Sequence, residues 1–269
     1  MVAIIGLVVL MVCVFGAPVM HGEMGPIIEA APHELFTIFG AGVGGMLIGN
    51  SGDTVKAALA GIGKIFKGPS FHKADYLATI FLVSKLMKVL KAEGAVALEA
   101  HIENPEASAI FGEFPKVLKE HALLHLITDT VRLMVVSQGN LDPMAVEDVM
   151  NLSIKTHHHG ALKAADTLGT LAGALPALGI VACVLGGLIG SALVGTFLGV
   201  FLAYGFFEPF SKRLAEIIND EGEIYGVVKQ IIIGTLNGHP MPLIIEAARV
   251  GISHHNQPSF AEVFDGMRG

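Results

Sequence analysis

The sequence has few charged residues, and long stretches of it have no basic residue at all. Charged side chains make up 15% of the 269 residues, whereas apolar ones make up 52%. A soluble domain of this length needs mixed charges over its whole surface, so the composition disfavours a purely soluble protein. Lysine and arginine are absent from residues 1–55 and 164–211. Because basic loops are retained on the cytoplasmic side of a membrane, both basic blocks, 56–163 and 212–269, are predicted to be cytoplasmic.

Cysteine is also scarce. The two cysteines, Cys13 and Cys183, are far apart in the sequence and lie in apolar segments. This distribution disfavours a disulfide framework, and both residues are interpreted as small hydrophobic side chains within a membrane.

The first 50 residues predict a hairpin of two membrane spans. Residues 1–20 carry no charge and match the roughly 20 residues that a helix needs to cross a bilayer. A signal peptide is the alternative, but a basic start and an A-x-A cleavage site are missing. The second span is predicted at 34–50, where small residues would let helices approach closely, so its glycines are expected to form a packing face: Gly40, Gly42, Gly44, Gly45 and Gly49.

A second hairpin is predicted at 164–211. Residues 167–207 contain no charged side chain, which is too long for one span and sufficient for two, near 165–186 and 190–209. Gly186, Gly187 and Gly190 mark the expected turn. The fold class is therefore an all-α membrane protein with four transmembrane helices and both termini in the cytoplasm.

The remaining segments, 51–163 and 212–269, are predicted to form a helical cytoplasmic domain and a C-terminal helix with a tail. One stripe has the 4-3-4-3 spacing of a buried helix face: Tyr76, Ile80, Val83, Met87 and Leu90. A second amphipathic pattern covers 115–136. Gly94 and the Asn104-Pro105 pair predict breaks between helices.

Several short motifs resemble those of one family. They are PALGIVACVLG from Pro176, LVGTFLGVFLAYGFFEP ending at Pro209, LEAHIENP at 98–105, IGN at 48–50, LNG at 236–238 and PSF at 258–260. In this order they are similar to MotA, the ion-conducting stator subunit of the bacterial flagellar motor. The resemblance covers essentially the whole chain.

The resemblance implies an assembly in the bacterial inner membrane. Family members form a pentamer around a MotB dimer, and ion flow through the complex turns the rotor through the protein FliG. The sequence agrees in one respect, because no Asp, Glu, Lys, Arg or His lies between Asp166 and Glu208. An ion route through these spans would need a carboxylate from a partner, which MotB would supply. No cofactor and no nucleic-acid partner are expected. No enzymatic activity is predicted either, because the sequence offers no nucleophile, base or metal constellation.

The resemblance also assigns residues to the ion pathway. Pro176 lies inside the third span, where proline removes a helix hydrogen bond, and it is expected to act as a hinge. Thr196 is the expected hydroxyl beside the ion route, and Pro209 marks the inner end of the fourth span. Sodium-driven relatives have a threonine seven residues after the proline, where this chain has Cys183. A thiol is a poor ligand for a hard cation, so the coupling ion is predicted to be H⁺.

Charged residues outside the spans are assigned in the same way. Lys91 and Glu99 match residues that the family uses against the rotor, although solvation of a helix face is the alternative. No metal site is predicted at His157, His158 and His159, because consecutive helical side chains point in different directions.

The sequence departs from the family at two places. The turn between the third and fourth spans is unusually short. This chain also has fewer of the acidic residues that relatives carry just before the third span. Two other functions remain open: a three-span energiser similar to ExbB or TolQ, and a solute-carrying secondary transporter, which would show inverted repeats.

Overall fold

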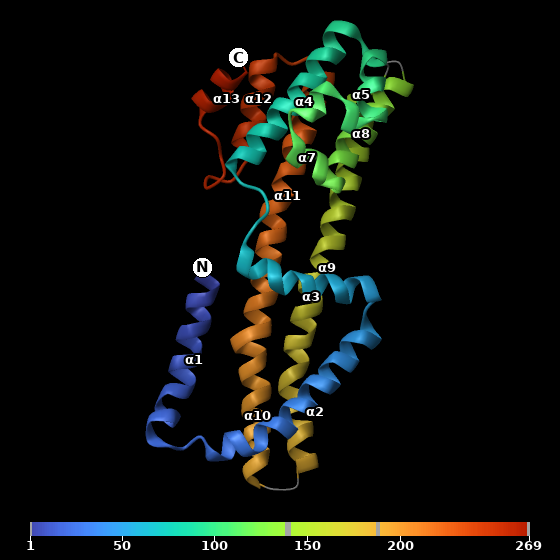
Figure 1. The fold of residues 1–269 in the computed structure, drawn as a ribbon. Coiled ribbons are helices and arrows are strands. Elements are labelled where there is room, and N and C mark those ends of the chain that lie inside the picture. The colour runs from blue at the N-terminus through green and yellow to red at the C-terminus, as the bar shows by residue number, and fades with distance from the viewer. Residues whose placement is uncertain (1, 138–140, 187–188, 268–269) are drawn as a thin grey trace. The chain divides into compact units, whose positions relative to one another are not determined.

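The computed structural model describes residues 2–137, 141–186 and 189–267, and the described chain is helical, without a strand (Figure 1). This agrees with the predicted all-α class. The α-helices are α1 (Val2–His21), α2 (Gly25–Gly49), α3 (Gly52–Lys67), α4 (Lys73–Glu93), α5 (Glu99–Glu103), α6 (Ala109–Gly112), α7 (Pro115–Lys119), α8 (His121–Val136), α9 (Pro143–Gly186), α10 (Ile189–Leu202), α11 (Glu208–Leu236), α12 (Met241–Val250) and α13 (Phe260–Gly266). Two 3₁₀ turns, η1 (Ala95–Leu98) and η2 (Pro105–Ala107), and one π-helical turn, η3 (Ala203–Phe207), complete the described elements.

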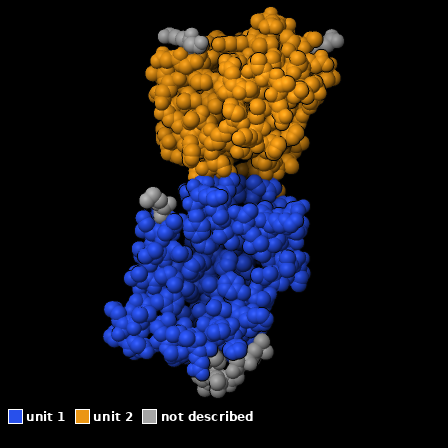
Figure 2. Space-filling view, in the orientation of Figure 1, with its two compact units in different colours: residues 1–68, 160–218 blue, residues 69–159, 219–269 orange. Residues whose placement is uncertain are grey.

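The chain divides into two compact units, which Figure 2 colours separately. Unit 1 contains residues 1–68 and 160–218, and unit 2 contains residues 69–159 and 219–269. Residues 51–68, which the sequence analysis placed with the cytoplasmic domain, pack within unit 1. The predicted boundaries at 163 and 212 also fall inside the continuous helices α9 and α11. The predicted turn around Gly187 lies outside the described residues.

Helix α2 packs one face against α9 and α10 in unit 1. Its buried residues recur every four positions, at Glu34, Ile38, Gly42 and Met46. The helix begins at Gly25, nine residues before the predicted span, and a short turn at 22–24 separates it from α1. Of the predicted glycine face, Gly42 meets another helix closely among the described residues, through the side chain of Leu171. An added Cβ at Gly40, Gly44, Gly45 or Gly49 would meet nothing within 4 Å, so a packing role for these four stays a prediction.

Helix α1 buries none of its residues in the chain. Many of its apolar side chains are exposed on unit 1, whereas Leu7, Leu10, Val14 and Phe15 are partly buried. Phe15 meets the rings of Phe197 and Phe201 edge to face. Among the described residues, three helical stretches are long and apolar enough to cross a membrane: Val2–His21, Pro143–Cys183 and Leu193–Leu236. Helix α2 is not one of these three, because glycines and polar residues interrupt its apolar sequence.

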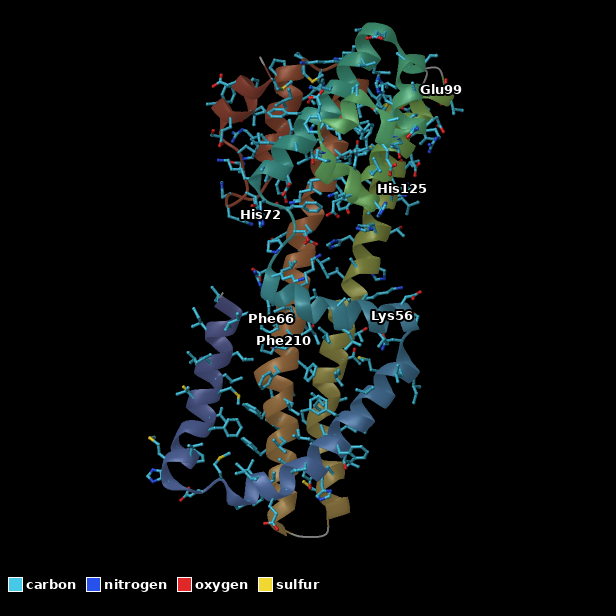
Figure 3. The ribbon with its side chains drawn as sticks, viewed as in Figure 1. Lys56, Phe66, His72, Glu99, His125 and Phe210 are labelled. Carbon is cyan, nitrogen blue, oxygen red and sulfur yellow. The ribbon has the colours of Figure 1, made fainter. Side chains whose placement is uncertain are left out.

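Helix α3 is amphipathic and crosses α9 and α11 within unit 1 (Figure 1). The hydroxyl of Ser51 caps its first turn by accepting from the amide of Thr54. Gly61 lies against Leu214 so closely that a Cβ atom there would be 2.5 Å from Cδ2. Near the end of the helix, Phe66 packs edge to face on Phe210, at 5.8 Å between ring centroids (Figure 3).

Unit 2 has the largest apolar core. The predicted stripe on α4 is confirmed, because Tyr76, Ile80, Val83 and Met87 are fully buried there. The predicted breaks are confirmed as well: α4 ends before Gly94, which has a φ of +86°, and α5 ends before Asn104. Burial of each large apolar side chain contributes about 1.5–3 kcal/mol, so this core holds the short helices in place.

Candidate functional site

The residues predicted for the ion pathway lie mainly on α9 and α10 in unit 1. Pro176 is half-buried inside α9, and the helix continues through it from Pro143 to Gly186. Proline at this position removes one helix hydrogen bond, which leaves a backbone carbonyl in the preceding turn without its usual donor. The predicted role of Pro176 as a hinge stays a prediction.

The structure brings Cys183 and Thr196 together across α9 and α10. The Cys183 Sγ and Thr196 Oγ1 atoms are 3.2 Å apart, a hydrogen-bond contact in which either atom can donate. The two residues were predicted separately from the family motifs, and their contact is a result of the tertiary structure. A thiol and a hydroxyl therefore face each other on these two helices.

Backbone contact between α9 and α10 surrounds this pair. A Cβ atom on Gly179 would be 2.6 Å from the Gly195 carbonyl oxygen, and one on Gly199 would be 2.6 Å from that of Leu175. Real side chains essentially never approach a backbone atom so closely, so these positions require glycine. The glycines of the PALGIVACVLG and LVGTFLGV motifs therefore set the distance between the two helices.

Glu34 of α2 lies next to the Cys183 and Thr196 pair. It was not recognised as a site residue from the sequence. Its side chain is 4% exposed and lies over Gly195, where an added Cβ would be 2.5 Å from Oε2. The Oε2 atom has no hydrogen-bond partner among the described residues. Glu34 was predicted to be the first residue of a span, whereas the structure places it well inside α2. The sequence feature that could have identified Glu34 as a site residue is its position as an acidic residue next to an apolar run.

Pro209 belongs to a different part of unit 1. It lies at the start of α11, is exposed, and is thirteen residues after Thr196, or about 20 Å of helix rise. It lines a cavity of about 730 Å³ together with residues of α1 and α3, including Leu10 and Phe66. The structure therefore does not gather Pro209 with the Cys183 and Thr196 pair.

The residues predicted to face the rotor lie in unit 2. Lys91 is exposed in the last turn of α4, where its ammonium group donates to the His239 carbonyl oxygen at 3.4 Å. Glu99 is exposed at the start of α5 (Figure 3). Gly94 and the η1 turn separate the two residues, and both charges remain accessible to a partner.

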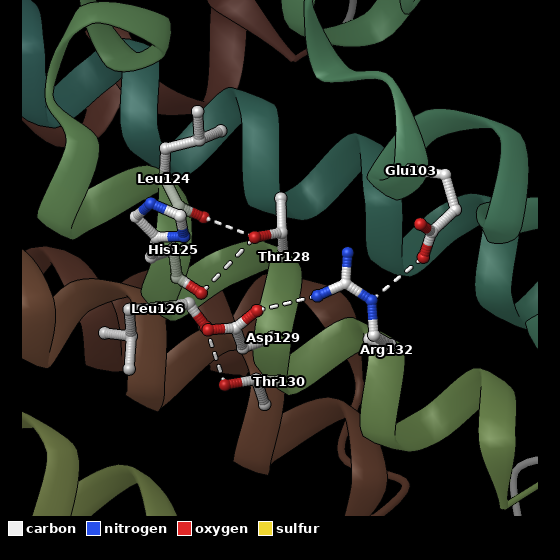
Figure 4. Close-up of polar contacts among 8 residues, drawn as sticks. All are labelled: Glu103, Leu124, His125, Leu126, Thr128, Asp129, Thr130 and Arg132. Carbon is white, nitrogen blue, oxygen red and sulfur yellow. Dashed lines mark hydrogen bonds and ion pairs between the residues drawn. The ribbon is translucent and has the colours of Figure 1, made fainter.

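An ion-pair bridge holds the helix that carries Glu99. Arg132 of α8 donates to Glu103 at 2.9 Å and to Asp129 at 2.8 Å (Figure 4). The hydrogen bond to Glu103 is the main reason that the pKa of Arg132 is raised. Glu99 and Glu103 are four residues apart on α5, so they lie on one face of this short helix. Arg132 thus links α8 to α5, and it was not singled out from the sequence.

The three consecutive histidines separate as their helical positions require. The ring of His157 contacts the Tyr225 hydroxyl at 3.0 Å, whereas His158 packs against Gly222. Burial lowers the pKa of His157 and raises that of Tyr225 to about 12. The pair is therefore a neutral contact between α9 and α11 within unit 2 at neutral pH.

Comparison with known proteins gives consistent similarities. A family model described as "Motility protein A N-terminal" matches residues 4–94. Motility protein A of Salmonella typhimurium (strain LT2) and that of Escherichia coli (strain K12) are each 33% identical over 285 aligned positions, covering 100% of this chain and 95% of the relative. Chemotaxis protein LafT of Vibrio parahaemolyticus is 30% identical, covering 96% of this chain and 95% of the relative.

Solved structures show the same fold. The "Structure of C. jejuni MotAB" aligns with a TM-score of 0.72 at 17% identity, covering 96% of this chain and 98% of the matched chain. The flagellar MotAB stator complex from Bacillus subtilis aligns with a TM-score of 0.64 at 18% identity, covering 91% and 92%. The sequence alignments span 285 positions against 269 residues here, so the relatives carry insertions that this chain lacks.

Proposed function

The chain belongs to the motility protein A family, and we propose on that basis that it is the ion-conducting stator subunit of a bacterial flagellar motor. With a MotB-type partner it would convert the ion-motive force across the inner membrane into torque on the rotor. The observation that carries this proposal is the similarity to motility protein A over the full length of the chain.

We further propose four membrane crossings with both termini in the cytoplasm. Three crossings correspond to the stretches that are long and apolar enough on composition alone. Helix α2 supplies the fourth: its 25 residues extend for about 37 Å, which exceeds the roughly 30 Å hydrocarbon core. Large apolar side chains on its outer face, Phe36 and Ile48, are 82% and 90% exposed, as lipid contact requires.

The partner proposal follows from what the membrane part of the chain offers. From α9 and α10, the Cys183 and Thr196 pair contributes a thiol and a hydroxyl but no carboxylate. A route that moves protons through this unit needs carboxyl groups, and a MotB-like subunit would supply one of them. A ring of five copies around two partner copies would bring α9 and α10 of each subunit to that group. We propose H⁺ as the coupling ion and FliG as the rotor partner.

Co-purification tests the proposed function. The chain is expressed with the MotB-like protein of its own organism, extracted in mild detergent, and the subunits are counted by native mass spectrometry. Five copies with two partner copies, together with restored swimming of a strain lacking the native gene, are expected. Recovery of the chain without the MotB-like protein, or with a partner of an outer-membrane system, would favour the ExbB or TolQ alternative.

Charge reversal at Lys91 is expected to reduce torque without loss of the complex. The residue is exposed in unit 2, far in sequence from the spans, so Lys91→Glu changes the charge presented to the rotor and leaves the core intact. Bead assays of single motors should show a clear fall in stall torque. Lys119, on α7, is also exposed, so Lys119→Glu is the matched control and should retain normal torque. Loss of the Lys91→Glu complex from membranes would indicate a structural role instead.

A further inference from the structure

Glu34 is a buried carboxyl group for which the proposed pathway has no role. It lies on the inner face of α2, 4% exposed, in line with Ile38, Gly42 and Met46. Within the part of the chain that the structure describes, its Oε2 atom has no hydrogen-bond partner. An unpaired carboxylate in an apolar interior is costly, and acidic residues inside membrane helices commonly mark ion and proton routes. A glutamine or leucine would fill the same space at lower cost.

The surroundings of the carboxyl group point to the pathway. Its oxygen rests on Gly195, the residue before Thr196, and the absence of a side chain at Gly195 provides the space that the carboxyl occupies. Thr196 in turn contacts Cys183. The carboxyl group of α2 therefore reaches the same turn of α10 that carries the predicted pathway hydroxyl.

Few other titratable groups face this position. From residue 167 to residue 207, which includes α10 and the adjoining part of α9, only Cys183 and Tyr204 are titratable. On α2 itself, Glu29 and His33 are exposed, within one and a half turns of Glu34. Under the proposed topology α2 begins at the outer surface, so Glu34 lies about 13 Å of helix rise below that surface. Under this topology Glu34 therefore lies in the outer half of its span.

We propose that Glu34 is a proton-binding group of this subunit, located on the outer half of the ion route beside Thr196. A proton from the outer side adds to the carboxylate oxygen, giving a neutral carboxylic acid, and later leaves for water or for the partner's carboxylate. No bond other than O–H forms or breaks. This inference rests on the proposed stator function and adds a second carboxyl group, contributed by each copy of the ring.

The test replaces Glu34 by glutamine, which keeps the shape of the side chain and removes the bound proton. The variant complex with the MotB-like subunit should accumulate in membranes at the wild-type level. Its proton flux, measured as acidification of vesicles that contain the purified complex, should fall by about 100-fold, as expected when a proton-transfer group is removed. Glu34→Asp retains a carboxyl group and should keep part of the flux, with an altered dependence on outside pH. Glu29→Gln, an exposed acid of the same helix, is the matched control and should conduct normally.

Two results would overturn the inference. Normal flux through the Glu34→Gln complex would show that no proton binds there, and failure of this isosteric variant to assemble would assign Glu34 to packing alone. The wild-type complex separates these results from a failure of the proposed function. If the wild-type chain neither binds the MotB-like subunit nor restores swimming, the stator function itself is wrong. If the wild type works and only the Glu34 comparison fails, the function stands without this group.

Discussion

Replacement of Gly199 by alanine is expected to stop flagellar rotation. A Cβ atom at this position would lie 2.6 Å from the Leu175 carbonyl oxygen and 3.1 Å from the Cα atom of Gly179. Both are backbone atoms, so no rotamer change can relieve the clash, and α9 and α10 must move apart. Overpacking of this kind costs about 1–3 kcal/mol and also displaces Thr196 from Cys183. Swimming assays and the membrane level of the complex measure the effect.

Gly173→Ala is the matched control for this prediction. Gly173 lies on the same helix as Leu175 and Gly179, but a Cβ atom there would meet nothing within 4 Å. The control variant should swim like the wild type, since alanine is also the better helix former. Normal rotation of the Gly199→Ala motor would show that the close approach of α9 and α10 is dispensable, and that the two helices separate in the working complex.

A protonophore is expected to stop swimming, whereas replacement of sodium by potassium is expected to leave the speed unchanged. Sodium must exchange its hydration shell for protein oxygens, while a proton needs only carboxyl groups and a hydrogen-bonded path. The contact between α9 and α10 joins a sulfur atom to one hydroxyl oxygen, at 3.2 Å. Sulfur is a poor ligand for a hard cation, so this pair is unsuited to hold sodium.

The measurement is the swimming speed within seconds of adding the protonophore in sodium medium, before the sodium gradient decays. A proton-driven motor stops at once under these conditions, and a sodium-driven one continues. A speed that rises and saturates with sodium at constant pH would contradict the proton assignment. The carbonyl group freed by Pro176 would then be the candidate ligand on α9.

Glu34 changes how the subunit can be understood within such a motor. If every copy in the ring binds a proton on α2, the ring contributes carboxyl groups of its own beside those of the partner. Neutralisation of a buried carboxylate removes its desolvation cost, so proton occupancy would change how tightly α2 packs on α10. The Glu34→Gln variant, permanently neutral, therefore reports on both conduction and helix packing.

The sequence by itself determined the helical class, the alternation of apolar and basic segments, and the buried stripe of α4. Hydrophobic periodicity and charge distribution are local properties of the chain, so Tyr76, Ile80 and Val83 could be assigned to one buried face without knowing their partners. The family motifs likewise pointed to Pro176, Cys183 and Thr196. The break at Gly94 followed from local backbone chemistry, because its φ of +86° is favourable for glycine alone.

Only the tertiary structure decided which of these residues meet. Three features each depend on contact between two separate helices. They are the contact of Cys183 with Thr196, the need for glycine at Gly199, and the position of the Glu34 carboxyl group against Gly195. Periodicity gives the face of one helix but not its depth or its partner. Gly42 therefore could not be distinguished from Gly40 and Gly44, where an added Cβ would meet nothing within 4 Å. For the same reason Glu34 was assigned to the edge of a span, and its burial appeared only when α2 packed against α10.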